Sequence, residues 1–293
     1  MKKQIVLSIL IFLSSVCFGE NVPLFYFCPY TGYASCKTDE IIYEEDGTYR
    51  SLLEWEEKHL ITTGLLFIAK FEKFSFDIFF DYSFPIAQGQ MCDRDWDYSE
   101  LYSITTHPIK KQQLINSGLG IEWFITQKDI FTLNGCAQIL YNFSNFNSDN
   151  GKGTRFNKPV SAYPIDYKKH SLFTFTGLKP RLEAFSHFFV DAGFLLSPFC
   201  LQYGYDYHHG IKHPWASNDL ETGFFSKFKA NAGCCYEFSE HFSLGLEFDI
   251  LFGFADKGTL YEQMADNTFS DLGETSGANH KWKSVTLYLS YHP

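Results

Sequence analysis

Apolar and polar residues alternate with a period of two along several segments of this chain. In residues 74–84 every even position is aromatic or aliphatic, while serine and aspartate occupy four of the five odd positions. Residues 242–254 again carry apolar side chains at every even position, with a glutamate and an aspartate on the other face. Segments 114–125 and 285–291 behave similarly. Such a period places successive side chains on opposite faces of β-strands, so the sequence predicts an all-β protein.

A membrane barrel and a soluble β-sandwich would both show this alternation. The length of the strands and the polarity of their second face favour the barrel. The predicted strands run to roughly 11–18 residues, whereas strands in globular sheets usually have about 5–6. Carboxylates recur on the face opposite the aromatic residues. A water-filled barrel interior accommodates them, but the dry core of a sandwich does not.

The connections between strands alternate between short and long. The short ones are predicted at 72–73, 127–129, 184–187 and 239–241, and the long ones near 44–50, 87–112, 147–165, 204–222 and 256–279. Short periplasmic turns and long extracellular loops are typical of outer-membrane barrels. Four turns and five loops predict a ten-stranded antiparallel transmembrane β-barrel with both termini on the periplasmic side.

The N-terminus is typical of a secreted protein. Lys2 and Lys3 precede an apolar stretch, and Cys17-Phe18-Gly19 resembles a cleavage site, so we expect a signal peptide at 1–19 and a single barrel domain at 20–293. Lipidation at Cys17 is the alternative. No later run of eighteen apolar residues predicts a transmembrane helix. The net charge of −10 gives no basic footprint for nucleic acid.

The cysteines argue against a zinc site. Removal of the signal peptide would leave seven of the eight, an odd number, and no CxxC motif is present. We expect most of them to be buried as small apolar residues. A disulfide between Cys28 and Cys36 remains an open expectation.

Two pairs of polar residues could carry chemistry. Asp93 and Asp95 occupy alternate positions of an extended segment, so their carboxylates can reach one spot, and mutual repulsion would raise one pKa. Asp206 and His208 combine a carboxylate with an imidazole, the arrangement of an oriented general base. Each pattern alone is also typical of a solvated loop. His209, His213 and His280 are near these pairs only by loop membership. His209 and His213 are interpreted as loop surface, because no third metal ligand has suitable spacing.

Several short motifs resemble the omptin family, and they fall in the same order and the same predicted loops. The run from Gln88 to Trp96 resembles the second-loop motif of that family, His107-Pro108 follows at the family's distance, and Asp206-Tyr207-His208 stands where omptins carry Asp-x-His. Further matches lie at Lys37–Glu40, Tyr43–Gly47, Leu53–Trp55, Tyr167-Lys168 and Gly177-Leu178. The resemblance extends from about residue 31 to 213.

The resemblance implies an outer-membrane aspartic-type endopeptidase that cuts polypeptides at the cell surface, without a cofactor. By this resemblance His208 would deprotonate a water while Asp206 orients the imidazole. Asp93 and Asp95 would hold that water and manage protons at the scissile carbonyl. Glu40 would bind a basic side chain of the substrate. No HExxH or GxSxG motif suggests another mechanism.

Two positions depart from the family pattern. Omptins often carry a second acid two residues before the catalytic aspartate, and Gly204 stands there, which puts a strict preference for Arg or Lys in doubt. Basic residues on the omptin barrel wall hold lipopolysaccharide, on which activity depends. The corresponding residues are Tyr141 and His170, so that dependence on an outer-membrane lipid is doubtful. A non-catalytic barrel, either an adhesin or a narrow pore, remains the alternative function. The sequence does not predict the oligomeric state.

Overall fold

The computed structural model describes residues 23–210, 215–263 and 268–293. These residues form sixteen strand segments joined in a single sheet. The segments are β1 (Leu24–Tyr43), β2 (Tyr49–Lys70), β3 (Phe74–Pro85), β4 (Gln90–Asp97), β5 (Glu100–Lys128), β6 (Phe131–Ser148), β7 (Gly151–Arg155), β8 (Lys158–Ala162), β9 (Ile165–Phe185), β10 (Phe188–His208), β11 (Trp215–Gly223), β12 (Lys227–Glu237), β13 (Phe242–Gly253), β14 (Asp256–Gln263), β15 (Phe269–Asp271) and β16 (Ser276–Tyr291). The described part of the chain holds no helix long and apolar enough to cross a membrane.

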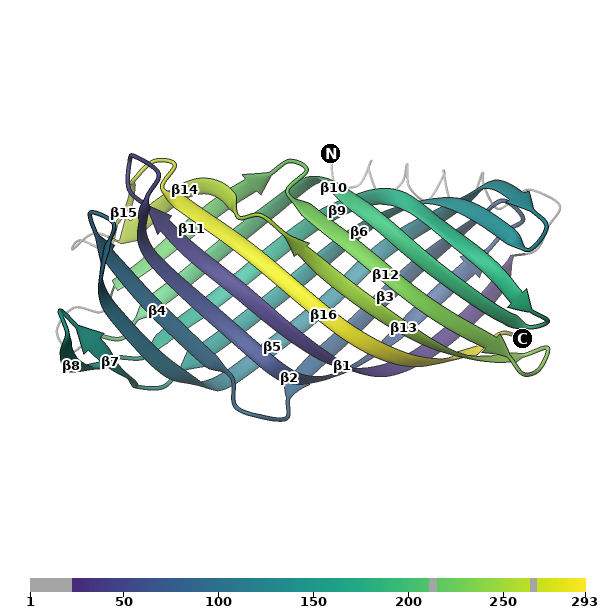
Figure 1. Cartoon of the computed structure of the whole chain (residues 1–293), viewed down its shortest axis with the longest axis horizontal. Coiled ribbons are helices and arrows are strands. Elements are labelled where there is room, and N and C mark those ends of the chain that lie inside the picture. The colour runs from purple at the N-terminus through teal and green to yellow at the C-terminus, as the bar shows by residue number, and fades with distance from the viewer. Residues whose placement is uncertain (1–22, 211–214, 264–267) are drawn as a thin grey trace.

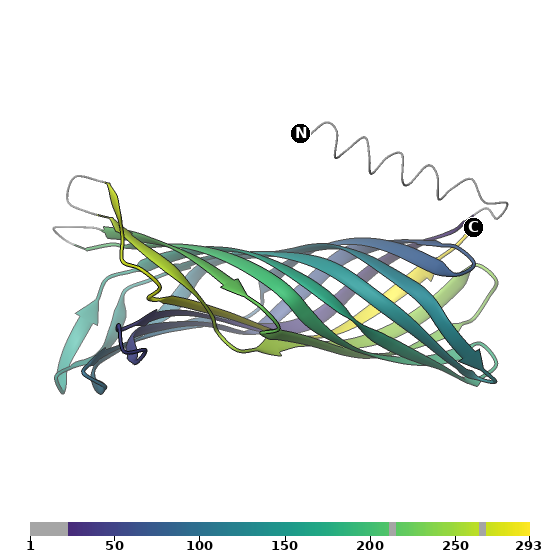
Figure 2. The ribbon, with the colours of Figure 1, turned by 90° about the horizontal axis from the view of Figure 1, so that it is seen from above.

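Antiparallel pairing closes the sheet into a barrel (Figure 1). From β1 the pairing passes through β2, β3, β5, β6, β9, β10, β12 and β13 to β16, and β16 pairs with β1 again. Closure leaves no free edge in this ring, so each strand finds backbone partners on both sides. The barrel is much longer than it is wide, and the strands cross it obliquely (Figure 2).

One end of the barrel carries long hairpins and the other carries short turns (Figures 1 and 2). Two-residue turns follow β5 and β9, and the other two short turns also lie where the sequence predicted them. The long connections predicted as loops are largely strand, which corrects that part of the prediction. β4 extends the ladder between β2 and β5, and β11 extends it between β10 and β14. Backbone pairing there satisfies polar groups that an irregular loop would leave to water.

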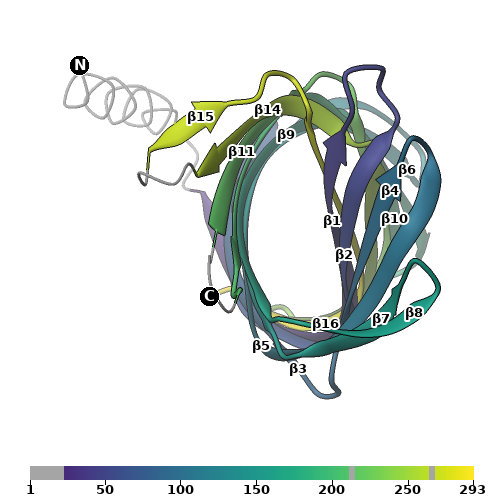
Figure 3. The same cartoon turned by 90° about the vertical axis from the view of Figure 1, so that its left-hand side faces the viewer.

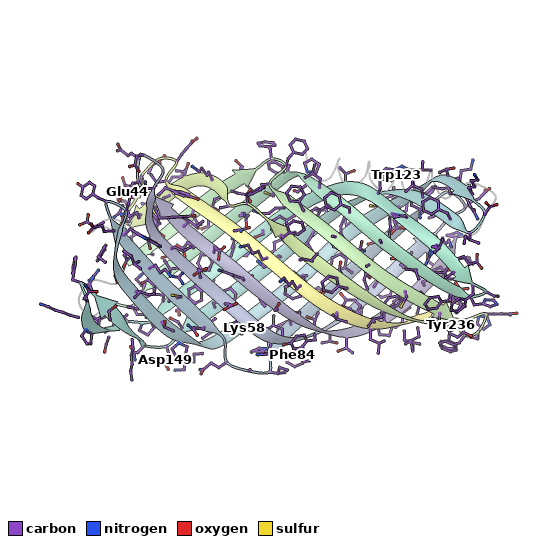
Figure 4. All side chains as sticks on the ribbon, in the orientation of Figure 1. Glu44, Lys58, Phe84, Trp123, Asp149 and Tyr236 are labelled. Atoms are coloured by element: carbon purple, nitrogen blue, oxygen red, sulfur yellow. The ribbon has the colours of Figure 1, made fainter. Side chains whose placement is uncertain are left out.

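The outer wall of the barrel is apolar and its interior is polar. Phe67, Ile78 and Leu287 are among the large apolar side chains that face outward. Inside, the amide of Asn116 donates a hydrogen bond of 2.9 Å to Asp81. Trp123 and Tyr236 lie toward the end with the short turns, whereas Glu44 and Asp149 lie at the opposite end (Figure 4). An apolar exterior around a polar interior shows that the soluble sandwich was the wrong alternative.

A stack of aromatic rings crosses the barrel interior below the end that carries the hairpins. The ring of Trp55, on β2, lies 5.4 Å from that of Phe146 on β6 and 5.8 Å from that of Tyr167 on β9, with the planes close to parallel. All three side chains are fully buried. Because Trp55 is the register partner of Met91 on β4, and Tyr167 that of Asp206 on β10, the stack joins the walls that carry β4 and β10.

The expected disulfide between Cys28 and Cys36 is wrong, since both thiols are free and buried. The two residues belong to one extended strand, and eight residues of strand span roughly 26 Å. A disulfide requires Cα atoms closer than about 7 Å. The expected signal peptide and the lipidation alternative at Cys17 both fall outside the described residues.

Candidate active site

Asp93 and Asp95 project from β4 at the mouth of the barrel. β4 is held between β2 and β5, and Asp93 is the register partner of Leu53 and of Thr105. Two residues apart on a strand, both side chains point to the same face, and both are partly exposed. Burial, and then the negative charge of Asp95, raise the pKa of Asp93 to about 7. The pair can therefore hold one proton near neutral pH, as the sequence predicted.

Asp206 and His208 form a hydrogen-bonded pair at the end of β10. Nε2–H of the imidazole donates to Oδ2 of Asp206 over 2.6 Å. The other carboxylate oxygen accepts hydrogen bonds from the backbone N–H of Ser217, at 3.1 Å, and from its hydroxyl. Asp206 is 2% exposed. A buried carboxylate held by several donors fixes both the tautomer and the orientation of the imidazole.

The two pairs stand on facing walls of the mouth and interact electrostatically. β4 lies on the opposite side of the mouth from β11, the neighbour of β10 (Figure 3). The pKa of Asp93 is raised mainly by burial and by Asp95, and the charge of His208 opposes these effects. The stacked rings below hold the walls together at the level of Tyr167, the register partner of Asp206. The structure thus brings the four residues to one mouth.

His107 supports the wall that carries the aspartate pair. It is fully buried on β5, its Nδ1–H donates to the carbonyl of Asp149 over 3.0 Å, and the Thr105 hydroxyl lies 2.9 Å from Nε2. Burial lowers the pKa of His107. A side chain at Gly151 would overlap the imidazole ring. We interpret His107 as a neutral structural residue that ties β5 to the start of β7.

Glu40 lies within a cluster of buried carboxylates behind the Asp206–His208 pair. We call Glu40, Asp206, Asp219 and Glu221 the carboxylate cluster. The four are 0–3% exposed. Burial, followed by the negative charges of the other three, raises the pKa of Glu40 well above its usual value. The interaction with Asp206 indicates that Glu40 lies close to the Asp206–His208 pair.

Sequence reasoning missed Asp219 and Glu221. Both were assigned to a long loop, but they lie on β11, where Ser217, Asp219 and Glu221 are buried at alternate positions. Alternation of polar residues predicts a strand as well as alternation of apolar residues does, provided that the interior is polar. That signal was present in the sequence.

His209 and His280 have structural partners. Nε2 of His209 lies 2.9 Å from a carboxylate oxygen of Asp166. The assignment of His280 to a loop was wrong, because it lies on β16, is 1% exposed and has Nδ1 3.0 Å from the Thr38 hydroxyl. His213 falls outside the described residues. Within the described ranges, no group of three or more His, Cys, Asp or Glu side chains could hold a metal ion.

Tyr141 and His170 lie side by side on the outer wall, with the Tyr141 hydroxyl 2.7 Å from Nδ1 of His170. The His170 ring also contacts the rings of Phe143 and Tyr203. This face therefore presents aromatic rings and one imidazole, together with the exposed Lys168 two residues before His170 on β9. The sequence resemblance would place basic residues at Tyr141 and His170, and the aromatic rings here are suited to lipid chains and their interface.

Replacing Asp93 with asparagine is expected to stabilise the barrel at alkaline pH. A folded-state pKa of about 7 lies above the unfolded value of about 3.9. At a pH below the pKa of the unfolded state, the raised pKa contributes its full stability to the folded protein. That contribution is lost as the pH rises through the pKa of the folded state. Asp93→Asn should therefore raise the Tm at about pH 8 more than at about pH 4. Asp97→Asn, at the exposed end of β4, serves as the control. Equal effects of Asp93→Asn at the two pH values would contradict the assigned pKa.

Comparison with known proteins places the chain in a family. The model of the Omptin family matches residues 30–292. The crystal structure of the outer membrane protease OmpT from Escherichia coli is similar, with a TM-score of 0.81 and 16% identity, covering 92% of this chain and 97% of that chain. The translocator domain of the autotransporter NalP from Neisseria meningitidis has a TM-score of 0.37 and 11% identity, covering 99% of this chain and 95% of that chain. None of the curated proteins matches.

At 16% identity, the likeness to OmpT shows the fold. The family match covers nearly all of the chain, including residues 214–292, where the sequence motifs were weak. It also spans both polar pairs and the carboxylate cluster. The chain belongs to the Omptin family.

Proposed function

We propose that this protein is an outer-membrane endopeptidase that hydrolyses peptide bonds at the outward-facing mouth of its barrel. The observation that carries the proposal is that an aspartate pair, in which the pKa of Asp93 is raised, and a hydrogen-bonded Asp–His pair lie at one end of the barrel. Membership of the Omptin family and the fold shared with an outer membrane protease support both the location and the peptidase activity.

The proposed orientation follows from the two ends of the barrel. Ten of the sixteen segments form the closed ring, and we propose that the six others extend these ten strands at the end with the hairpins. Outer-membrane barrels have short turns on the periplasmic side and longer connections outside. The end with the hairpins, which carries both polar pairs, therefore faces the exterior.

In the proposed reaction a water molecule between the pairs attacks the carbonyl carbon of the scissile bond. Nε2–H of His208 is bound to Asp206, so Nδ1 takes the proton from the water as the oxygen–carbon bond forms. Asp206 orients the imidazole and stabilises its charged form. The same proton then passes to the departing amine nitrogen as the carbon–nitrogen bond breaks. No covalent intermediate with the enzyme forms.

The aspartate pair has a separate role in this mechanism. Asp93, with a pKa of about 7, holds a proton and donates a hydrogen bond to the carbonyl oxygen as negative charge develops there. Asp95 accepts a hydrogen bond from the attacking water. One member acts as an acid and the other as an anchor because their environments differ. This assigns an aspartic-type mechanism to the protein.

The proposed substrates are polypeptides cut next to a basic residue. Glu40 is buried behind the Asp206–His208 pair, and its Oε2 has no donor among the described residues. A guanidinium or ammonium group would supply donors and compensate the charge. The natural substrate is not predicted.

Digestion of a mixed peptide library by the refolded protein, with fragments identified by mass spectrometry, tests this function. We expect cleavage at internal bonds, enriched beside Arg and Lys. If a folded barrel that shows heat-modifiable gel migration leaves the library intact, the proposal is wrong and a non-catalytic barrel takes its place. The pore alternative is less well supported, because buried aromatic side chains fill the interior below the mouth.

A further inference from the structure

Gly204 leaves a space in the barrel wall that its neighbours fill. In the register of the sheet, Gly204 on β10 lies between Lys169 on β9 and Asp219 on β11. A Cβ atom at Gly204 would overlap the carboxylate of Asp219. Asp219 therefore reaches across from the adjacent strand and places its charge where a side chain of β10 would otherwise lie. Asp206, two residues further along β10, points to the same face.

Four oxygens of the carboxylate cluster, none of them on Asp206, lack donors. Asp219 Oδ2, Glu40 Oε2 and both Oε atoms of Glu221 are buried, and no group in the described part of the chain donates to them. Asp219 and Glu221 can share a hydrogen bond only if one of them carries a proton. Each unsatisfied buried acceptor costs free energy that a bound donor would recover.

The charges of the cluster are also unbalanced. Asp206 is compensated by His208 and by the donors of Ser217. The other three carboxylates share one buried ammonium group, that of Lys169, whose Nζ donates 3.1 Å to the carbonyl of Asn279. Three carboxyl groups beside one ammonium group favour the entry of a cation with several donors, which would stabilise their charged forms.

The hydroxyl of Tyr167 belongs to the same region. Tyr167 is fully buried, its ring stacks on Trp55, and its hydroxyl has no partner among the described residues. A ligand that both donates to carboxylates and packs along an aromatic ring would match this region. A planar guanidinium on an aliphatic stem has these properties.

We infer that Asp219 is a specificity-determining residue, which with Glu40 and Glu221 binds the guanidinium of an arginine side chain next to the cleaved bond. This inference rests on the proposed function. It assigns the preference of the endopeptidase for a basic side chain to a residue on β11. The absence of an acid at Gly204 then does not relax the preference for a basic residue, because the neighbouring strand supplies the carboxylate.

The test compares two peptides that differ only in arginine or citrulline before the cut bond. Citrulline has nearly the same shape as arginine but no charge. For the full-length protein in detergent with lipid, we expect kcat/KM to favour arginine by about 100-fold. Asp219→Asn should reduce this ratio by at least about 10-fold, chiefly by lowering kcat/KM for the arginine peptide. Asp46→Asn, in the exposed turn after β1, is the matched control.

A charge swap keeps the test decisive if Asp219→Asn does not fold. Gly204→Asp combined with Asp219→Gly returns one carboxylate to the same place from β10, and we expect it to retain the arginine preference. A wild-type protein that cleaves both peptides equally overturns the inference while leaving the proposed function standing. An unchanged ratio in Asp219→Asn overturns it as well. Failure of the wild type to cleave either peptide, or any library member, rejects the proposed function itself.

Discussion

Replacing His208 with alanine is expected to lower kcat/KM for peptide cleavage by about 10²- to 10⁴-fold, with little change in KM. The imidazole takes a proton from water only as the new bond forms, so its loss affects the transition state more than substrate binding. His208 lies at the end of β10 with a partly exposed side chain, so the substitution creates no large cavity. Steady-state kinetics with a fluorogenic peptide measures the effect.

His209→Ala is the matched control for this prediction. His209 follows directly in the chain, and its imidazole lies 2.9 Å from Asp166, a carboxylate that is not part of the proposed mechanism. Its removal should change kcat/KM by less than about threefold. Equal losses in the two variants would mean that His208 acts through the local structure and not as the base.

Replacing Asp95 with asparagine is expected to lower kcat by about 10²-fold and to move the alkaline limb of the pH–rate profile to lower pH. The proposed acid is protonated Asp93, so activity should fall as pH rises through its pKa of about 7. The charge of Asp95 is the second cause of that raised pKa, after burial. Its removal allows Asp93 to lose its proton at lower pH. The alkaline limb of the pH–rate profile therefore moves to lower pH.

The profile of kcat/KM against pH, measured from about pH 5 to 9, tests the direction of this shift. Asp97→Asn removes a carboxylate from the exposed end of the same strand and should leave the limb in place. Because the groups at the mouth are coupled, the limb reports their joint titration. A shift to higher pH in Asp95→Asn would show that the aspartate pair does not act as the acid.

The barrel could be predicted from the sequence because its physical requirements are periodic. The outer wall needs an apolar side chain at every second position and the interior tolerates polar ones, so residues 74–84 and 242–254 stand out. Turns of a few residues between such segments leave little freedom for the chain path. The upper hairpins were mistaken for loops because both of their faces are largely polar, so alternation in hydrophobicity disappears although the ladder of hydrogen bonds continues.

The candidate site was predictable only in part. Asp93, Asp95, Asp206 and His208 stand in recognisable short motifs, and the structure brings them to one mouth. The carboxylate cluster depends on register, since Asp219 reaches the space beside Gly204 only because the two are partners across β10 and β11. Register between strands is set by pairing over the whole barrel, and no local motif encodes it.

A double-mutant cycle between Asp95→Asn and His208→Ala tests the central claim, that facing walls of the barrel supply the parts of one catalytic unit. Residues that act on the same water lose their separate effects once either is removed. We expect the double variant to retain about the same kcat/KM as His208→Ala alone. If the two losses instead multiply, the pairs act independently and the single site proposed for this mouth does not exist.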